Sequence, residues 1–459
     1  MTKIKELWYR PCGYAQVLHL AFPLVLSTGS WSIQHFVDRM FLSWYSSNAL
    51  AASMPAGMLS FSLVSFFLGT AGYVNTFVAQ YYGARQFDKI GAAIWQALYF
   101  VLLSGIVFIS MIPCASVIFA WAGHSPKIQL LEIEYFRILS VGAVFIVYAS
   151  VLSSFFTGRG KTWTVMWVNI FATAINLILD YAFIFGHWGF PEWGMAGAAW
   201  ATVISAFVSA TLFSLLYFLP KKYRDTYSTV KNWRLQKFLF WRLMCYGIPS
   251  GIQFMLEMTA FTLFIFMIGR MGNIELAAST MSFQINTLAF LPMIGFGIAT
   301  STLVGQQVGE KKPKIAMRAT WSAFHLTFAY MSVISLCYLF FPSLFIEPYA
   351  MNAEPLIFAK IRPMAVVLLR FIAAYSLFDA ASIIFSSCLK GAGDTRFVML
   401  YSLTLSWCVM VIPTWYVVKH QIGGLFLPWM FMLIYIFLVG CGFFLRFLQG
   451  KWLTMQVIE

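Results

Sequence analysis

Long apolar runs separated by short polar connectors dominate the chain. Each run continues for more than about 18 residues without alternating apolar and polar positions, which is typical of transmembrane helices and excludes a transmembrane β-barrel. The runs lie at about 15–44, 50–81, 91–121, 133–157, 163–186, 194–219, 241–269, 275–308, 316–346, 356–389, 397–418 and 424–447. The pattern therefore predicts an all-α polytopic membrane protein with twelve transmembrane helices.

The composition leads to the same class. Of the 459 residues, 61% are hydrophobic and 10% are charged, and the mean hydropathy is +0.78. A soluble domain carries about 25% charged residues, so a soluble enzyme is excluded. The twelve runs account for most of the chain, and little of it is left outside the bilayer.

The net charge of +14 is a signal of orientation. Most of the 30 Lys and Arg residues lie in the connectors on the same side as the N-terminus, among them Lys161, Lys221 and Lys312. The positive-inside rule then puts both termini in the cytoplasm, as an even number of spans requires. We therefore expect anionic lipid at these basic loops and no nucleic acid as a partner.

The chain divides into two similar halves. The longest polar connector, 221–237, separates six runs from six. A shift of 226 residues superposes Pro23 on Pro249, Gly69 on Gly295, Thr76 on Thr302, Gln80 on Gln306 and Trp95 on Trp321. Because six helices return the chain to its starting side, the repeats are parallel. We expect two six-helix lobes, 1–225 with the start of the linker and 226–459, around a central cavity.

Four carboxylates lie well inside the apolar runs, whereas the other acidic residues lie in connectors or at helix ends. They are Asp38, Asp180, Glu257 and Asp379. Each costs roughly 2.5 to 3.5 kcal/mol to insert near the bilayer centre, which marks them as functional candidates. The alternative is a structural ion pair or a protonated acid, with Arg39 or Arg370 as the partner.

Neighbours at helical spacing favour the functional interpretation. Asn176 precedes Asp180 by four residues, Phe261 follows Glu257 by four, and Tyr375 precedes Asp379 by four. Residues four apart share a helix face. A carboxylate beside amide or phenol oxygens is suited to a hard cation or a proton.

Two prolines fall inside predicted helices. Pro23 lies in the first run and Pro249 in the seventh. A proline in a helix interior removes one backbone hydrogen bond and allows bending, so both are candidate hinges, with a static kink as the alternative.

Other motifs point to no enzymatic or cofactor chemistry. Gly160-Lys161-Thr162 ends like a nucleotide-binding loop, but Phe155 occupies the position of its first glycine. The cysteines and histidines show no metal-ligand spacing. We therefore expect neither a cofactor nor a structural metal, and read the polar N-terminal segment as the lead into a first helix rather than as a signal peptide.

Taken together, these residues resemble the multidrug and toxic compound extrusion (MATE) transporters, in particular their NorM-like branch. The likeness covers nearly the whole chain. It includes Pro23, Val37-Asp38, the Gly-Ala pair after Gln80, and Pro292 with Gly295, as well as the segment Gly391-Ala392-Gly393-Asp394-Thr395-Arg396.

The resemblance implies specific sites. A cation or proton site in the N-terminal lobe of that family corresponds to Asp38, Asn176, Asp180 and Thr202, with the backbone of Ala198 as an additional ligand. The NorM-like branch also uses a second site in the other lobe.

That second site corresponds to Glu257 and Asp379, with Phe261 and Tyr375 beside them. The resemblance implies Na⁺ or H⁺ as the coupling ion at these two sites.

The function that the resemblance implies is secondary active antiport. We expect a monomeric, non-enzymatic carrier in a bacterial cytoplasmic membrane that exports cationic or amphiphilic compounds by alternating access. The main alternative is a flippase for lipid-linked glycans, which would present basic residues to an anionic headgroup, whereas the intramembrane charges here are mainly acidic. An ion channel lacks a repeated filter sequence, and an intramembrane protease would need Asp394 in the membrane rather than in a basic connector.

Overall fold

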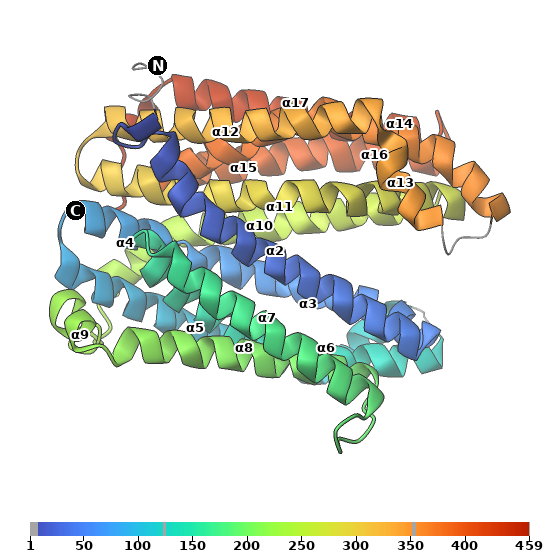
Figure 1. Cartoon of the computed structure of the whole chain (residues 1–459), viewed down its shortest axis with the longest axis horizontal. Helices are drawn as coiled ribbons and strands as arrows, with labels where there is room; N and C mark the ends of the chain where they lie inside the picture. Colours follow the sequence, from blue (N-terminus) through green and yellow to red (C-terminus); the bar gives the residue numbers. More distant parts are fainter. Residues whose placement is uncertain (1–7, 123–124, 351–354, 459) are drawn as a thin grey trace. The chain divides into compact units, whose positions relative to one another are not determined.

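The computed structural model describes residues 8–122, 125–350 and 355–458, and all regular elements in these ranges are helices (Figure 1). The first half of the chain forms α2 (Tyr14–Tyr45), α3 (Ser47–Gly72), α4 (Val74–Gly83), α5 (Phe87–Ala122), α6 (Pro126–Gly158), α7 (Thr162–Phe185), α8 (Met195–Phe218) and α9 (Lys221–Tyr227). The second half forms α10 (Lys237–Gly269), α11 (Asn273–Gly309), α12 (Pro313–Phe340), α13 (Pro342–Ala350), α14 (Pro355–Ala392), α15 (Thr395–Leu405), α16 (Ile412–His420) and α17 (Phe426–Leu448). A π-helical turn, η1 (Ser406–Val411), joins α15 to α16, and a short 3₁₀ turn, η2 (Lys451–Thr454), follows α17.

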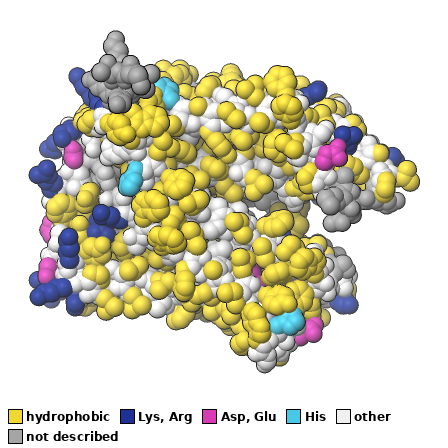
Figure 2. Space-filling model, viewed as in Figure 1, with side chains coloured by type: hydrophobic (Ala, Val, Ile, Leu, Met, Phe, Trp, Pro, Cys, Tyr) yellow, Lys and Arg dark blue, Asp and Glu magenta, His cyan; other side chains and the backbone are white. Residues whose placement is uncertain are grey.

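The predicted all-α membrane fold is confirmed. Ten helical segments are long and apolar enough to cross a membrane, with α3–α4 and α15–η1–α16 each counted as one. The long helices α2 and α14 bring the described segments to the predicted twelve, and these two carry Asp38 and Asp379. Hydrophobic side chains cover much of the face seen in Figure 2, while Lys and Arg lie toward the helix ends. Large exposed apolar surfaces of this kind mark contact with a membrane or with another protein.

Proline and glycine set several of the helix boundaries. Pro126 begins α6 and Pro313 begins α12, where the fixed φ of proline suits the first helical turn and its missing N–H costs nothing. The helix α7 ends at Gly186, which has a left-handed φ of 70°. The start of α12 and the end of α7 fall within three residues of the predicted runs, whereas α6 begins seven residues before the predicted start at 133.

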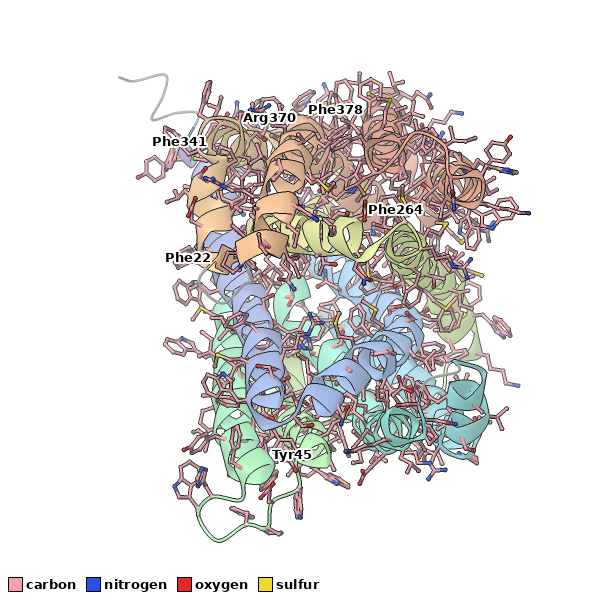
Figure 3. The ribbon with its side chains drawn as sticks, turned by 90° about the vertical axis from the view of Figure 1, so that its right-hand side faces the viewer. Phe22, Tyr45, Phe264, Phe341, Arg370 and Phe378 are labelled. Atoms are coloured by element: carbon pink, nitrogen blue, oxygen red, sulfur yellow. The ribbon has the colours of Figure 1, made fainter. Side chains whose placement is uncertain are left out.

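The contacts divide the chain into two compact units. Unit 1 comprises Met1–Val25 and Leu256–Gln456, and unit 2 comprises Leu26–Met255 and Val457–Glu459. Both α2 and α10 are therefore shared, because each begins in one unit and ends in the other. In Figure 3, Phe22 and Tyr45 label the parts of α2 that belong to unit 1 and unit 2, and Phe264 labels the part of α10 in unit 1. The predicted lobes, 1–225 and 226–459, follow from the sequence repeat and stay a prediction.

Glycines related by the repeat pack against the shared helices α10 and α2, one in each unit. In unit 2, a Cβ on Gly69 of α3 would lie 2.8 Å from the Cα of Gly251 on α10. In unit 1, a Cβ on Gly295 of α11 would lie 2.8 Å from the backbone nitrogen of Val25 on α2. Gly69 and Gly295 are related by the 226-residue shift, and so are Val25 and Gly251. The repeat thus preserves one close backbone contact, which only a residue without a side chain allows.

One central helix organises each unit. In unit 2, α6 packs against α3, α5 and α8, and the surrounding core contains the fully buried Phe77 and Phe155. In unit 1, α14 packs against α11, α12 and α17, around cores that contain Phe264 and Phe385. The fourth membrane helix of each half therefore holds the same place, as expected for a repeat.

Candidate functional site

Three of the predicted N-terminal site residues meet between α2 and α7. Asp38 is 6% exposed, and Asn176 and Asp180 are fully buried. With its amide nitrogen turned toward the acids, as its neighbours require, Asn176 donates to Asp38 Oδ1 at 3.2 Å and to Asp180 Oδ2 at 3.1 Å. One side chain therefore bridges carboxylates that lie 142 positions apart in the sequence.

The two carboxyl groups also lie close enough to interact with each other. A direct hydrogen bond between them would require a proton on one of the acids, since two carboxylates only accept. Asp180 Oδ1 is buried and has no hydrogen-bond partner among the described residues. Two adjacent carboxylates repel each other when both are ionised, and a proton or a cation between them would relieve that repulsion.

Two further side chains adjoin this pair, and the sequence reasoning missed both. The amide of Gln34, one turn before Asp38 on α2, lies 3.3 Å from the amide nitrogen of Asn176. Tyr135 of α6 is buried and interacts electrostatically with Asp38 and Asp180. The four-residue spacing identifies Gln34, whereas nothing in the local sequence around Tyr135 points to the pair.

Ala198 and Thr202 lie on α8, which packs against α7. Ala198 is 1% exposed and belongs to a core cluster with Ile184 of α7. Thr202 is half-buried, and its carbonyl oxygen accepts a hydrogen bond from Ser205. Their participation as ligands stays a prediction.

In unit 1, Glu257 of α10 and Asp379 of α14 form a second acidic pair. The two acids interact electrostatically, and the buried Tyr375 and the half-buried Tyr435 interact with this pair. Lys390, near the end of α14, also interacts with Glu257. This second pair therefore has a basic neighbour, a feature that the sequence reasoning missed.

The neighbours of this second pair differ in their roles. Phe261 packs edge-on against Phe283, with ring centroids 4.9 Å apart, so its observed contact is hydrophobic. Arg370, labelled on α14 in Figure 3, is exposed and forms no ion pair with a described residue. The structural alternative in which Arg370 neutralises Asp379 is therefore not formed. Arg39 is exposed as well and acts on Asp38 only through an electrostatic interaction.

Both candidate hinges lie inside continuous helices. Pro23 falls within α2 and Pro249 within α10, and neither helix is interrupted there. Pro23 precedes the point where α2 passes from unit 1 to unit 2 by two residues, and Pro249 precedes the corresponding point on α10 by six. Bending at these positions stays a prediction.

The part of the chain that the structure describes contains no group of three or more His, Cys, Asp or Glu side chains that could hold a metal ion. A cation at either acidic pair would therefore rely on amide, hydroxyl or backbone oxygens for its remaining ligands. Oxygen ligands of this kind suit a hard ion rather than a transition metal.

Comparisons with known proteins place the chain in a defined group. The MatE family model matches residues 23–182 and 249–417, and the two matches begin at Pro23 and Pro249, again 226 residues apart. A probable multidrug resistance protein NorM of Brucella suis is 26% identical over 415 residues, covering 88% of this chain and 86% of the relative. The NorM protein of Thermotoga maritima is 23% identical over 445 residues, covering 96% and 94%.

Solved structures share the fold. A multidrug resistance MATE family transporter of the MOP superfamily, in an outward-facing conformation, aligns with a TM-score of 0.87 and 20% identity over 98% of both chains. A MOP superfamily transporter from Pyrococcus furiosus, described as having a binding pocket of reversed polarity, aligns with a TM-score of 0.86 and 20% identity over 98% of both chains.

Proposed function

The chain belongs to the MatE family, whose members are membrane transporters rather than enzymes, and from this we propose that it is an antiporter that exports cationic or amphiphilic compounds in exchange for Na⁺ or H⁺. The NorM relatives carry the name of multidrug resistance proteins, which supports a drug-like, small-molecule substrate. The observation that carries the coupling is the buried pair Asp38 and Asp180 with Asn176 between them.

The chemistry of this pair suits ion exchange. Without a bound ion, two buried carboxylates would repel each other, and one proton or one Na⁺ removes that repulsion. Asn176 presents an amide nitrogen to the acids and an amide oxygen on its other side, so rotation of the amide lets it serve as a cation ligand. Ion entry therefore changes the charge and the hydrogen bonds that join α2 to α7.

The energy for export comes from the ion gradient. Each positive charge that moves inward gains about 2.3 kcal/mol per 100 mV of membrane potential. An ion held at Asp38 and Asp180 alters the contact between α2 and α7 and so favours one of the two access states. Glu257 and Asp379 form a second acidic pair that can bind substrate or a further ion.

Lipid and orientation are part of the same proposal. We infer a bacterial cytoplasmic membrane, both termini in the cytoplasm and anionic lipid at the basic loops, with a single chain as the transporting unit. A reporter domain that fluoresces only in the cytoplasm, fused after Glu459, tests the orientation. A fully expressed fusion protein that does not fluoresce would contradict a cytoplasmic C-terminus.

Transport in membrane vesicles tests the function. We expect an imposed Na⁺ or pH gradient to drive export of ethidium, a flat lipophilic cation. Asp38→Asn and Asp180→Asn are expected to lower the gradient-driven rate by roughly tenfold or more, because a neutral amide cannot take up the coupling charge. Asp88→Asn, at an exposed position in the first turn of α5, is the matched control.

Two outcomes would decide against the assignment. If Asp38→Asn and Glu257→Gln both leave gradient-driven export unchanged, the carboxylates do not couple transport to the ion. If the vesicles move a lipid-linked glycan but no organic cation, the flippase alternative replaces the antiporter.

A further inference from the structure

The segment after α17 is anchored in both compact units. Its first anchor is Trp452 of η2, in unit 1, which is fully buried. The indole N–H donates to the carbonyl oxygen of Phe447 at 2.9 Å, and the two rings stack with centroids 5.4 Å apart. The indole belongs to a core cluster that also contains Val308 and Phe385, so this end of the segment is fixed to unit 1.

The second anchor lies in unit 2. Val457 is fully buried and Ile458 is 3% exposed, and both belong to the core cluster that contains Val78 and Leu243. Few residues beyond a last helix are buried to this degree unless they are held in place.

Polar contacts fix the backbone of this second anchor. The Val457 N–H donates to Gln80 Oε1 at 2.8 Å. Arg242 donates through Nε to the Val457 carbonyl at 2.6 Å and through a terminal nitrogen to the Ile458 carbonyl at 3.1 Å. Hydrogen bonds from a guanidinium are among the stronger ones in proteins. Gln80 belongs to α4 and Arg242 to the first part of α10, so the segment ties itself to two helices of unit 2.

Only a short piece of chain joins the two anchors. Val457 follows Trp452 by five residues, and even a fully extended chain of that length spans at most about 17 Å. The Gln456 side chain, in the middle of this piece, is exposed. As long as both anchors hold, the chain sets an upper limit on the distance between the core around Trp452 and the core around Val457.

The anchors share one side of the membrane. The last turn of α4, the first turns of α10 and the end of α17 all lie on the side of the basic connectors, because even-numbered spans end where odd-numbered spans begin. Under the proposed function this side is the cytoplasm, and alternating access requires it to open.

We propose that residues 452–458 form a strap, fixed in one unit by Trp452 and in the other by Val457 and Ile458, that restrains the separation of the units on the side of the basic connectors. Its role in transport rests on the proposed function, since only an alternating-access carrier needs that opening. Release of the strap shifts the protein toward the state that is open on this side.

The test lengthens the strap without touching its anchors. A Gly-Ser-Gly-Ser-Gly-Ser insertion between Met455 and Gln456 adds up to roughly 20 Å of reach. The control is the same insertion between Gly423 and Gly424, in the exposed connector between α16 and α17. Thermal unfolding checks that all variants remain folded.

Spin labels report the separation of the units directly. Labels on bioorthogonal amino acids at the exposed positions Lys161, in unit 2, and Lys314, in unit 1, leave the native cysteines untouched. Pulsed dipolar distances are measured in lipid nanodiscs without any gradient. We expect the lengthened strap to add a population at longer distance, and the control insertion to keep the wild-type distribution.

A second pair of variants tests the anchor itself. Val457→Asp puts a charge into the apolar core of unit 2 and is expected to release the strap and give the same longer distances. Gln456→Asp, with the same charge on the neighbouring exposed side chain, is the matched control and should behave as the wild type.

The strap is overturned if the lengthened variant and Val457→Asp both keep the wild-type distances. This result does not depend on transport. A wild-type protein that moves no organic cation under a gradient would overturn the proposed function and leave the distance result standing.

Discussion

Replacing Asn176 by leucine tests whether the amide between the two acids sets the affinity for the coupling ion. Leucine has nearly the shape of asparagine but removes the donor that lies 3.2 Å from Asp38 Oδ1 and 3.1 Å from Asp180 Oδ2. It also removes the amide oxygen that would bind a cation. The acids are expected to stay in place, because both are buried on continuous helices.

The magnitude follows from the hydrogen bonds that are lost. A hydrogen bond to a charged group contributes about 1.5 to 3 kcal/mol, and each 1.4 kcal/mol corresponds to a factor of about ten in affinity. If the coupling ion is Na⁺, losing the amide oxygen as a ligand in the Na⁺-bound state therefore raises the Na⁺ concentration at half-maximal transport by about 10- to 100-fold. If the coupling ion is H⁺ instead, the lost amide donor no longer favours the ionised acids, so Asn176→Leu shifts the pH dependence toward higher pH by about one to two units.

The assay is ethidium export from vesicles, recorded at stepwise Na⁺ concentrations at fixed pH and at stepwise pH without Na⁺. Asn169→Leu is the matched control, because Asn169 lies on the same helix and its amide nitrogen donates one neutral hydrogen bond to Ser27 Oγ at 2.7 Å. It should leave both dependences unchanged. The reasoning is refuted if Asn176→Leu also retains the wild-type dependence on both ions.

Three further predictions concern stability and reactivity. Arg159→Gln should lower the free energy of unfolding in detergent by about 2 to 4 kcal/mol. The reason is that the buried guanidinium lies over four aromatic rings, the nearest with its centroid at 3.6 Å. The control Lys161→Gln, at an exposed position, should have little effect. Gly69→Ala should cost about 1 to 3 kcal/mol in a thermal unfolding experiment, because its Cβ would meet backbone at 2.8 Å, whereas Gly57→Ala on the same helix meets nothing within 4 Å. Burial raises the pKa of the Cys12 thiol from 9.0 to about 11, so we expect the folded protein to resist maleimide at this residue at pH 8, with mass spectrometry as the readout and the detergent-unfolded chain as the reactive reference. Because the unfolded thiol loses its proton near pH 9 and the folded thiol only near 11, the same shift should reduce stability as the pH rises between these values.

The sequence predicts contacts within a helix much better than contacts between helices. The apolar runs locate the helices, and the four-residue spacing places Asn176 and Asp180 on one face of α7. That Asp38 meets them depends on how α2 packs, and only the family resemblance suggested it. Tyr135 and Lys390 were missed for the same reason, since each reaches its acid from a different helix and no local pattern records that approach.

The compact units are divided differently from the predicted lobes, which stay a prediction. The polar linker and the repeat suggest a boundary near residue 225, because both are properties of the order of the chain. Compactness depends on packing instead, and packing assigns the first part of α2 to unit 1 and the first part of α10 to unit 2. Gly69 and Gly295 recur at the repeat spacing and so indicate a close contact between helices. The sequence does not indicate which helix packs against each glycine.

Because α2 and α10 each begin in one unit and end in the other, the acids on these two helices lie on segments that both units share. Asp38 lies on the part of α2 that belongs to unit 2, and the same continuous helix begins in unit 1 against Gly295. Glu257 lies on α10 just after that helix passes from unit 2 to unit 1. An ion that bound at Asp38, as proposed above, would therefore act on a continuous helix whose first part packs in unit 1. A proline lies a few residues before each crossing, where the lost backbone bond makes bending least costly. Under the proposed function, an ion at either pair would therefore act on a helix that is shared by the two units.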